Sequence, residues 1–228
     1  MSCPIRAVVF DMDDTLYDEM MFVRSGFQSV ARYLGIRFDL EEQKIYQIML
    51  ERLNSDGRGK IFDSVLKLHN IYSPRLVEEL IEVYRTHTPK ISLYSDVVET
   101  LERLRVEQLK IGIITDGLHS VQKTKVRALK LQDLVDFIIY TDELGSGYEK
   151  PHPAAFLRAI EILNCEPTDI LYVGNNPEKD IFGANSVGMG SAHICRGDYT
   201  CNGSCNARFH AKSLKSLFDD VPLTLGEG

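Results

Sequence analysis

Short runs of apolar residues recur along the chain and alternate with stretches of helical periodicity. Polar and apolar positions do not alternate within these runs, which is typical of strands covered on both faces of a parallel sheet. The runs lie at 6–10, 110–115, 136–141, 169–174 and 191–195. The helical patterns lie at 96–107, 119–130, 153–164 and 178–187. This order predicts a doubly wound, Rossmann-like α/β fold with a parallel sheet.

The stretch that follows the first predicted strand breaks this alternation. Its apolar spacing indicates helices only, separated by Gly, Asn and Pro residues. These helices are expected at 19–34, 41–53, 60–69 and 74–86. We therefore expect two domains, an α/β core of residues 1–16 and 92–228 and an inserted α-helical cap of residues 17–91.

Composition narrows the class of protein. The chain has 228 residues, of which 44% are hydrophobic and 26% charged, as is usual for a soluble protein with a substantial core. Its formal net charge of -7 argues against a nucleic-acid partner, because such proteins hold phosphates with clustered Lys and Arg. No apolar run approaches the roughly 20 residues of a membrane helix, and no secretory signal pattern is visible. We expect a cytoplasmic protein without a membrane partner.

The cysteines also bear on location. They are Cys3, Cys165, Cys195, Cys201 and Cys205. An odd number in a chain of this length indicates free thiols in a reducing compartment. One short stretch combines possible zinc ligands, namely His193, Cys195, Cys201, Cys205 and His210. The paired C-x₂-C spacing of common structural zinc sites is missing, so a metal site and free cysteines around a polar loop both stay open.

Several polar residues stand where predicted strands end or shortly after them. They are Asp11, Asp13, Asp14, Thr115, Lys150, Asn175 and Asp180. Ligands of α/β proteins bind beyond the carboxyl ends of the strands. Each residue alone also has an ordinary structural explanation, such as capping a helix, satisfying nearby backbone groups or standing in solvent as a charge.

Together the motifs resemble the haloacid dehalogenase (HAD) superfamily, in its branch of small-molecule phosphatases. The family's order is followed by "DMDDT", "ITDG", "EKPHPAAF" and "VGNNPEKDIFGA", within residues 5–194. The helical insertion is similar to the family's mobile cap. The resemblance implies a phosphatase that hydrolyses a small phosphorylated metabolite with Mg²⁺ as cofactor.

The resemblance implies a chemical role for two of the carboxylates. Asp11 is expected to be the nucleophile that forms an aspartyl-phosphate, which splits one hydrolysis into two easier steps. Asp13 is expected to protonate the leaving oxygen and then to deprotonate the attacking water, transfers worth about 10²- to 10⁴-fold in rate. True dehalogenases resemble this family but lack an acid at that position, so phosphate ester hydrolysis is favoured over carbon-halogen cleavage.

The same resemblance implies a set of phosphate-binding groups. Thr115 is expected to offer its hydroxyl, and the neighbouring Asp116 and Gly117 their backbone N–H groups. Lys150 is expected to neutralise the phosphate and the crowded carboxylates, which otherwise raise each other's pKa values. In the predicted cap, Arg58 is either a contact for a second anionic group or a charged surface residue.

Mg²⁺ is expected to bind Asp11, the backbone carbonyl of Asp13 and Asn175, because it prefers oxygen ligands with one or two carboxylates. The family usually has Asp at the position of Asn175. A unit charge about 4 Å away corresponds to roughly 4 kcal/mol at an effective dielectric constant of ~20, so weaker Mg²⁺ binding is expected. Asp180 is expected to compensate as a ligand or by holding metal-bound water, or else it opens a helix.

Two other functions stay open on the sequence. A phosphomutase acting on a sugar phosphate would share the first step and return the phosphoryl group to the substrate. A non-catalytic phosphometabolite-binding protein would retain the pocket with its metal site weakened at Asn175. The substrate is left open among phosphorylated sugars, nucleotides and short organic acids, and so is the oligomeric state.

Overall fold

The computed structural model describes residues 5–199 and 205–221, and the chain divides into two compact units. One unit combines the residues up to Glu19 with those from Ser92 onward, and the other is Met20–Ile91. The first boundary lies slightly later than the one expected after residue 16. The role of the second unit as a cap stays a prediction.

The first unit is built on a six-stranded sheet in the order β3-β2-β1-β4-β5-β6, in which every neighbouring pair is parallel. The strands are β1 (Ala7–Phe10), β2 (Lys110–Thr115), β3 (Phe137–Tyr140), β4 (Ile170–Gly174), β5 (Gly190–Ile194) and β6 (Phe209–Ala211). The predicted doubly wound α/β fold is therefore confirmed. The short strand β6 was not predicted. The order reverses direction between β1 and β4, and such a switch point opens a crevice at the carboxyl ends of the strands.

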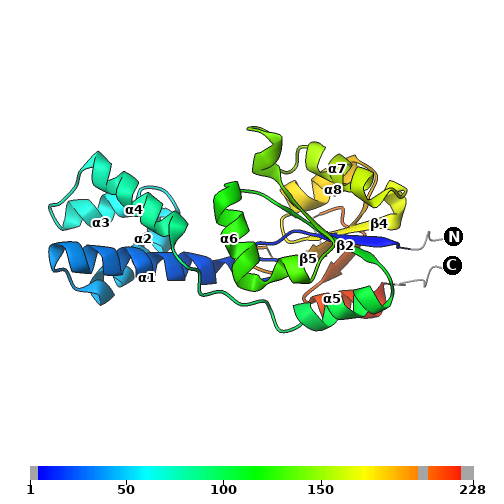
Figure 1. The fold of residues 1–228 in the computed structure, drawn as a ribbon, viewed down its shortest axis with the longest axis horizontal. Helices are drawn as coiled ribbons and strands as arrows, with labels where there is room; N and C mark the ends of the chain where they lie inside the picture. Colours follow the sequence, from blue (N-terminus) through cyan, green and yellow to red (C-terminus); the bar gives the residue numbers. More distant parts are fainter. Residues whose placement is uncertain (1–4, 200–204, 222–228) are drawn as a thin grey trace. The chain divides into compact units, whose positions relative to one another are not determined.

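Helices cover both faces of this sheet (Figure 1). They are α5 (Val97–Val106), α6 (His119–Leu129), α7 (Ala154–Leu163), α8 (Phe182–Ser186) and α9 (Leu214–Asp220), with the single turns η1 (Leu131–Asp133), η2 (Thr141–Leu144), η3 (Pro167–Asp169) and η4 (Pro177–Ile181). Successive side chains of a strand point to opposite faces. Val9 accordingly packs in a cluster with Phe156 of α7, whereas Phe10 meets Phe218 of α9 at a ring-centroid distance of 6.3 Å. All four residues of β1 are buried.

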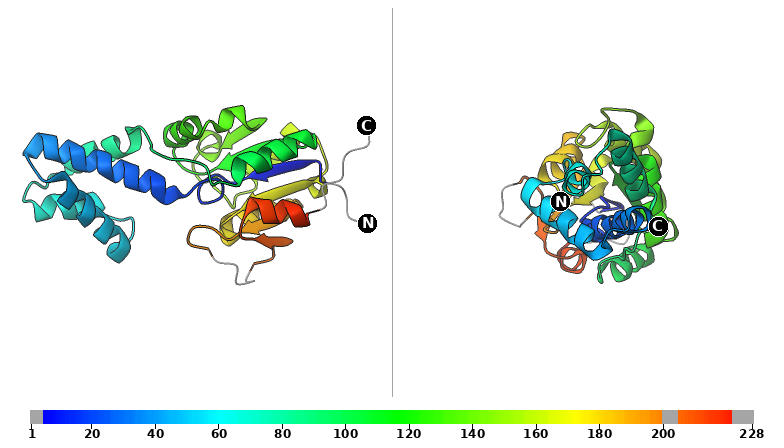
Figure 2. Two further views of the ribbon diagram at one scale, coloured as in Figure 1. Left: turned by 90° about the horizontal axis from the view of Figure 1, so that it is seen from below. Right: turned by 90° about the vertical axis from the view of Figure 1, so that its left-hand side faces the viewer.

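The second unit is an all-helical body (Figure 2), and it has its own apolar core. Its helices are α1 (Glu19–Phe38), α2 (Glu42–Asp56), α3 (Ile61–Leu68) and α4 (Pro74–Thr86). The start of α4 shows why the local sequence folds this way, because Ser73 accepts a hydrogen bond from the backbone N–H of Leu76 and Pro74 occupies the first turn. Among the described helices, none combines the length and the apolar character needed to span a bilayer.

The chain leaves and re-enters the first unit at one place. Tyr17 and Leu93 form an antiparallel bridge, and the backbone N–H of Tyr94 donates to the carbonyl of Leu16 at 3.0 Å. The two segments that connect the first unit to the second are therefore hydrogen-bonded to each other within the first unit.

Candidate active site

The predicted site residues that follow β1 and β4 lie side by side at the switch point. These strands are paired with Phe10 opposite Val173, and the backbone N–H of Asp11 donates to the carbonyl of Val173 at 2.9 Å. Asp11 is only 6% exposed. A carboxylate at this position is therefore largely shielded from bulk water.

A buried ion-pair network surrounds Lys150. Its Nζ lies 2.5 Å from Oδ1 of Asp11 and 2.8 Å from Oδ1 of Asp180. The same ammonium donates to the hydroxyl of Tyr172 at 3.2 Å and reaches the carbonyl of Ile114 at 3.4 Å. Two carboxylates thus share one cation, and the structure brings together three of the residues singled out in the sequence.

Charge and burial have opposite effects on the pKa values of the residues in this network. Burial raises the pKa of Asp11 to about 8, the positive charge of Lys150 opposes that rise, and Asp180 adds to it. Burial disfavours a charged Lys150, but the two carboxylates outweigh it, so the pKa of Lys150 is raised well above its ordinary value. Lys150 is therefore a permanent cation. A second cation beside Asp11 would lower the pKa of that carboxyl group.

Asp13 is held by side chains that the sequence interpretation missed. Its Oδ1 accepts from Nζ of Lys125 at 2.7 Å, its Oδ2 accepts from Nε2 of Gln122 at 2.7 Å, and the hydroxyl of Tyr17 donates to Oδ1. Burial by itself raises the pKa of Asp13, but the charge of Lys125 and these hydrogen bonds lower it below its ordinary value. Burial and the charge of Asp13 raise the pKa of Tyr17 far above its usual range, so Tyr17 stays a neutral donor.

A signal for two of these missed residues was present in the periodicity of α6. Gln122, Lys125, Val126 and Leu129 are its buried residues, spaced i, i+3, i+4 and i+7 along one helix face. Polar residues at core-facing positions of a helix need partners. Here the partner is a carboxylate at the end of β1.

The loop after β2 contributes Thr115, Asp116 and Gly117. Thr115 is fully buried, and its Oγ1 accepts a hydrogen bond from Gln122 at 2.6 Å. Oδ1 of Asp116 accepts from the backbone N–H of Lys150 at 3.1 Å, so this side chain ties the loop to the segment that carries the lysine. Gly117 has φ 109, a backbone conformation that favours glycine.

The loop after β4 places Asn175 and Asp180 differently. Asn175 is buried, and its Nδ2 lies 3.5 Å from the carbonyl of Arg196. Both carboxylate oxygens of Asp180 are engaged, Oδ1 by Lys150 and Oδ2 by the backbone N–H of Asn176 at 3.0 Å. A Cβ at Gly174 would lie 2.5 Å from that carboxylate. Glycine is therefore required where Asp180 folds back over the end of the strand.

The donor atoms near Asp11 fit Mg²⁺. Oδ2 of Asp11 accepts a hydrogen bond from Thr15 at 3.1 Å. Asn175 offers a side-chain oxygen, while its Nδ2 faces the carbonyl of Arg196. With the backbone carbonyl of Asp13 these atoms form an all-oxygen donor set of the kind that Mg²⁺ prefers. Asp180 is placed to hold Lys150 instead, because both of its oxygens are already in use.

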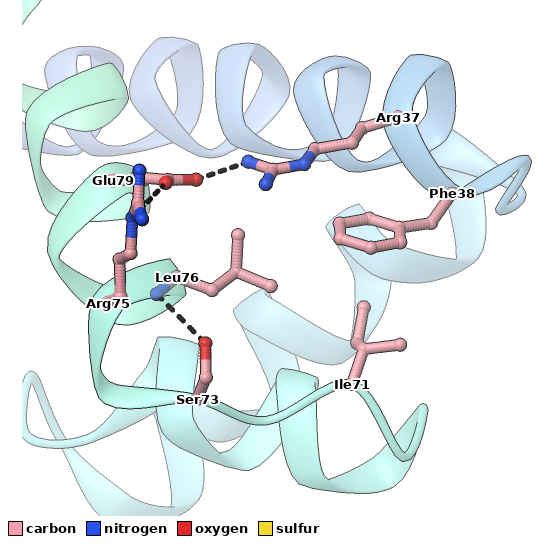
Figure 3. A pocket seen from close by; sticks show the side chains of 7 residues that line it. All are labelled: Arg37, Phe38, Ile71, Ser73, Arg75, Leu76 and Glu79. Atoms are coloured by element: carbon pink, nitrogen blue, oxygen red, sulfur yellow. Dashed lines mark hydrogen bonds and ion pairs between the residues drawn. The ribbon is translucent and has the colours of Figure 1, made fainter.

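Arg58 belongs to the second unit, where it lines a largely apolar cavity of about 280 Å³ together with Lys60 and Tyr84. Its expected contact with an anionic group of the substrate stays a prediction. A second cavity of about 460 Å³ lies elsewhere in the same unit (Figure 3). There Glu79 pairs with both Arg37 and Arg75, so the two positive charges are partly neutralised.

Comparison with known proteins adds a family and relatives. The model of the family described as "Haloacid dehalogenase-like hydrolase" matches residues 8–194. The glyceraldehyde 3-phosphate phosphatase of Methanopyrus kandleri is 33% identical over 202 residues, which cover 86% of each chain. The ribulose-1,5-bisphosphate 5-phosphatase of Halopiger xanaduensis is 31% identical over 198 residues, covering 80% of this chain and 82% of that protein. A crystal structure of a HAD phosphatase from Thermococcus onnurineus is 29% identical, with a TM-score of 0.64, and covers 94% of this chain and 97% of its own.

Proposed function

Because this chain belongs to the haloacid dehalogenase-like hydrolase family, we propose that it is a phosphatase that hydrolyses phosphate monoesters of small phosphorylated metabolites. The observation that carries the proposal is the buried contact of Asp11 with Lys150, at 2.5 Å between Oδ1 and Nζ. A carboxylate held in a shielded crevice by a permanent cation suits attack on a negatively charged phosphoryl group.

Asp11 is the proposed nucleophile. Its carboxylate attacks phosphorus and displaces the alcohol oxygen of the substrate, which leaves an aspartyl-phosphate that water then hydrolyses. Lys150 offsets the negative charge on the carboxylate and the phosphoryl oxygens during both steps. Asp180 is a positioning residue in this scheme, because its carboxylate holds the ammonium at 2.8 Å.

Asp13 is the proposed acid and base. It lies two residues beyond Asp11 and is ionised in the resting protein, since its pKa is lowered from the ordinary value. An arriving phosphate raises the pKa of a neighbouring carboxyl group, because like charges disfavour ionisation. Asp13 then takes up a proton from solvent, gives it to the leaving oxygen and later takes one from water. Lys125 and Gln122 keep the side chain oriented between the two steps.

Mg²⁺ is the proposed cofactor, held by Asp11, the backbone carbonyl of Asp13 and Asn175. When bound, it would polarise a phosphoryl oxygen and offset part of its charge. Thr115 and the loop of Asp116 and Gly117 are proposed to bind the remaining phosphoryl oxygens. The neutral amide of Asn175 leaves the metal with one carboxylate fewer than an Asp would provide.

Small phosphorylated sugars are the proposed substrate class. Support comes from the two phosphatases above, whose names give a triose phosphate and a pentose bisphosphate. The second unit, Met20–Ile91, is the proposed cap, and its closure would exclude water before the attack. Location in the cytoplasm and the lack of nucleic-acid and membrane partners stay predictions.

The test is phosphate release from a panel of triose, pentose and two-carbon phosphates and an activated aryl phosphate, in millimolar Mg²⁺. Wild type is compared with Asp11→Asn, and Asp56→Asn on the surface of the second unit is the matched control. We expect turnover by wild type and control and none by Asp11→Asn. Equal release by all three would remove Asp11 from the chemistry. Isomerised sugar phosphate without free phosphate would favour a mutase over a phosphatase.

A further inference from the structure

A cluster of nitrogen and sulfur ligands lies at the sheet edge formed by β5 and β6. His193 on β5 and His210 on β6 are register partners in the two parallel strands, and Cys205 lies in the connection between them. One possible ligand atom from each residue lies within 4.8 Å of the other two. The fold thus gathers three of the residues that the sequence left open as a zinc cluster.

Of the other two members of that sequence cluster, one is oxidised and one lies outside the described residues. Cys195 is disulfide-bonded, so its sulfur is not a free thiolate, and the expectation of five free thiols is wrong for this residue. The number of cysteines shows whether all of them can pair, but not which of them lie close together. Cys201, like Cys3, lies outside the described residues. Cys205 and Cys165 carry free thiols.

Burial of the three ligands gives the cluster a closed side and an open side. His193 is 2% exposed, Cys205 is half-buried and His210 is exposed. The rings of the two histidines meet edge to face, with centroids 5.6 Å apart. An ion can therefore reach the cluster from the solvent side, past His210, and still bind His193, whose ring is buried in the core.

A hydrogen bond orients His193 for ligation. Its Nε2 lies 3.0 Å from the backbone carbonyl of Asn175. A carbonyl can only accept, so Nε2 carries the hydrogen and the neutral ring presents the lone pair of Nδ1. Metal-binding histidines typically donate their other N–H to a carbonyl or carboxylate in this way.

We propose that His193, Cys205 and His210 bind one Zn²⁺ ion. Zinc accepts imidazole nitrogen and thiolate sulfur at about 2.0 and 2.3 Å, so tetrahedral ligand atoms lie roughly 3.3–3.6 Å apart. The ligand atoms of the observed cluster lie within 4.8 Å of one another, so binding would draw the three side chains closer together. Three protein ligands leave a fourth position for water on the open side, and binding releases the thiol proton of Cys205 to solvent.

The proposed ion would also affect the active site, through the backbone of Asn175. His193 would be fixed by zinc on Nδ1 and would hold the carbonyl of Asn175 with Nε2. The side chain of the same Asn175 is a proposed Mg²⁺ ligand. A zinc site would thus stiffen the loop that presents this ligand, without contacting the substrate.

The test uses zinc and cobalt ions alone, titrated into metal-free full-length protein without added thiol reductant. We expect one tightly bound Zn²⁺ per chain and, with Co²⁺, a thiolate charge-transfer absorption. Cys205→Ala and His210→Ala should each weaken Zn²⁺ binding by more than about 100-fold, because even the loss of a residue that supports a ligand costs about 10- to 100-fold. Cys205→Ala should also abolish the charge-transfer band.

Two control variants separate this site from others. Cys165→Ala removes the other described free thiol, and Asp11→Asn removes the ligand most suited to a metal in the active site. Both should retain the tightly bound Zn²⁺. Its retention in Cys205→Ala, or its loss in Asp11→Asn, would overturn the proposal. His210 and Cys205 are not core residues, so these variants should fold.

Discussion

Nζ of Lys125 lies 2.7 Å from Oδ1 of Asp13, and the lysine side chain is only 5% exposed. This ion pair joins helix α6 to the segment that follows β1. It lowers the pKa of Asp13 against the effect of burial. The residue that we propose as acid and base, which would change its protonation state in each turnover, is thus held by a cation that favours its ionised state.

The variant Lys125→Met tests this coupling. Removal of the cation should raise the pKa of Asp13, so the acidic limb of the phosphatase pH-rate profile should move to higher pH. It should also lower the free energy of unfolding by about 3–5 kcal/mol, because an unpaired buried carboxylate remains. Lys123→Met, exposed on the same helix, is the matched control. In Lys125→Met with Asp13→Asn the stability loss should be smaller, and an equal loss would contradict the pairing.

The variant Asn175→Asp tests the metal site. The added carboxylate should tighten Mg²⁺ binding by at least about tenfold, which is well within the roughly 4 kcal/mol of a unit charge about 4 Å away at an effective dielectric constant of ~20. Calorimetric titration of Mg²⁺ measures this. Asn164→Asp adds the same charge at an exposed position after α7 and should leave the affinity unchanged. Unchanged affinity in Asn175→Asp itself would remove Asn175 from the ligand set.

The variant Asp180→Asn distinguishes a metal ligand from a positioning residue. Because both oxygens of Asp180 are bonded within the protein, we expect kcat to fall by about 10²-fold, comparable with the loss of one electrostatic contact to the transition state. The Mg²⁺ affinity should change by less than about threefold, far below the effect expected for a lost charged ligand. A parallel fall in Mg²⁺ affinity, measured by titration, would show that Asp180 binds the metal.

The variant Gly174→Ala tests the close approach of Asp180 to the end of β4. The new methyl group would lie 2.5 Å from the carboxylate, so Asp180 must move and release Lys150. We expect a loss of about 1–3 kcal/mol in stability and a drop in kcat. Gly59→Ala is the control, because a Cβ there meets nothing within 4 Å. Wild-type kcat in Gly174→Ala would show that the position of Asp180 does not matter for turnover.

A histidine makes the stability of the second unit depend on pH. His87 is buried as a neutral ring, with Nδ1 2.6 Å from the carbonyl of Tyr84 and Nε2 2.7 Å from the hydroxyl of Ser25. Burial lowers its pKa, so the unfolded chain binds the proton more readily than the folded one. The free energy of unfolding should therefore fall as the pH drops below the ordinary histidine pKa of about 6.5.

Chemical denaturation between about pH 5 and 8 measures this slope, since histidine is the side chain that ordinarily titrates there. His87→Gln should flatten the curve of the second unit, and the half-buried His69 of the same unit supplies the control His69→Gln. Equal slopes in wild type and His87→Gln would assign the pH dependence to other groups.

The sequence, through its resemblance to the HAD family, predicted that Lys150 neutralises the crowded carboxylates, and its Nζ lies 2.5 Å from Oδ1 of Asp11. It did not reveal Lys125 and Gln122, since a polar residue on an amphipathic helix is ordinarily exposed and only the finished fold shows what faces it. The position of Asp180 depends on the missing side chain of Gly174, whose place its carboxylate occupies. The disulfide at Cys195 depends on which cysteine the fold brings close to it. Neither is encoded in a local pattern.

The hydrogen-bonded base of the insertion, where Tyr17 pairs with Leu93, makes the two units separable in evolution. The ends of the inserted segment are joined within the sheet-containing unit, so the entropy of closing that loop grows only slowly with the length of what is inserted. A lineage can therefore exchange Met20–Ile91 for a helical body of another size and retain the same sheet. If the proposed roles of the two units hold, the reaction chemistry of one and the substrate choice of the other can then diverge at different rates within one gene.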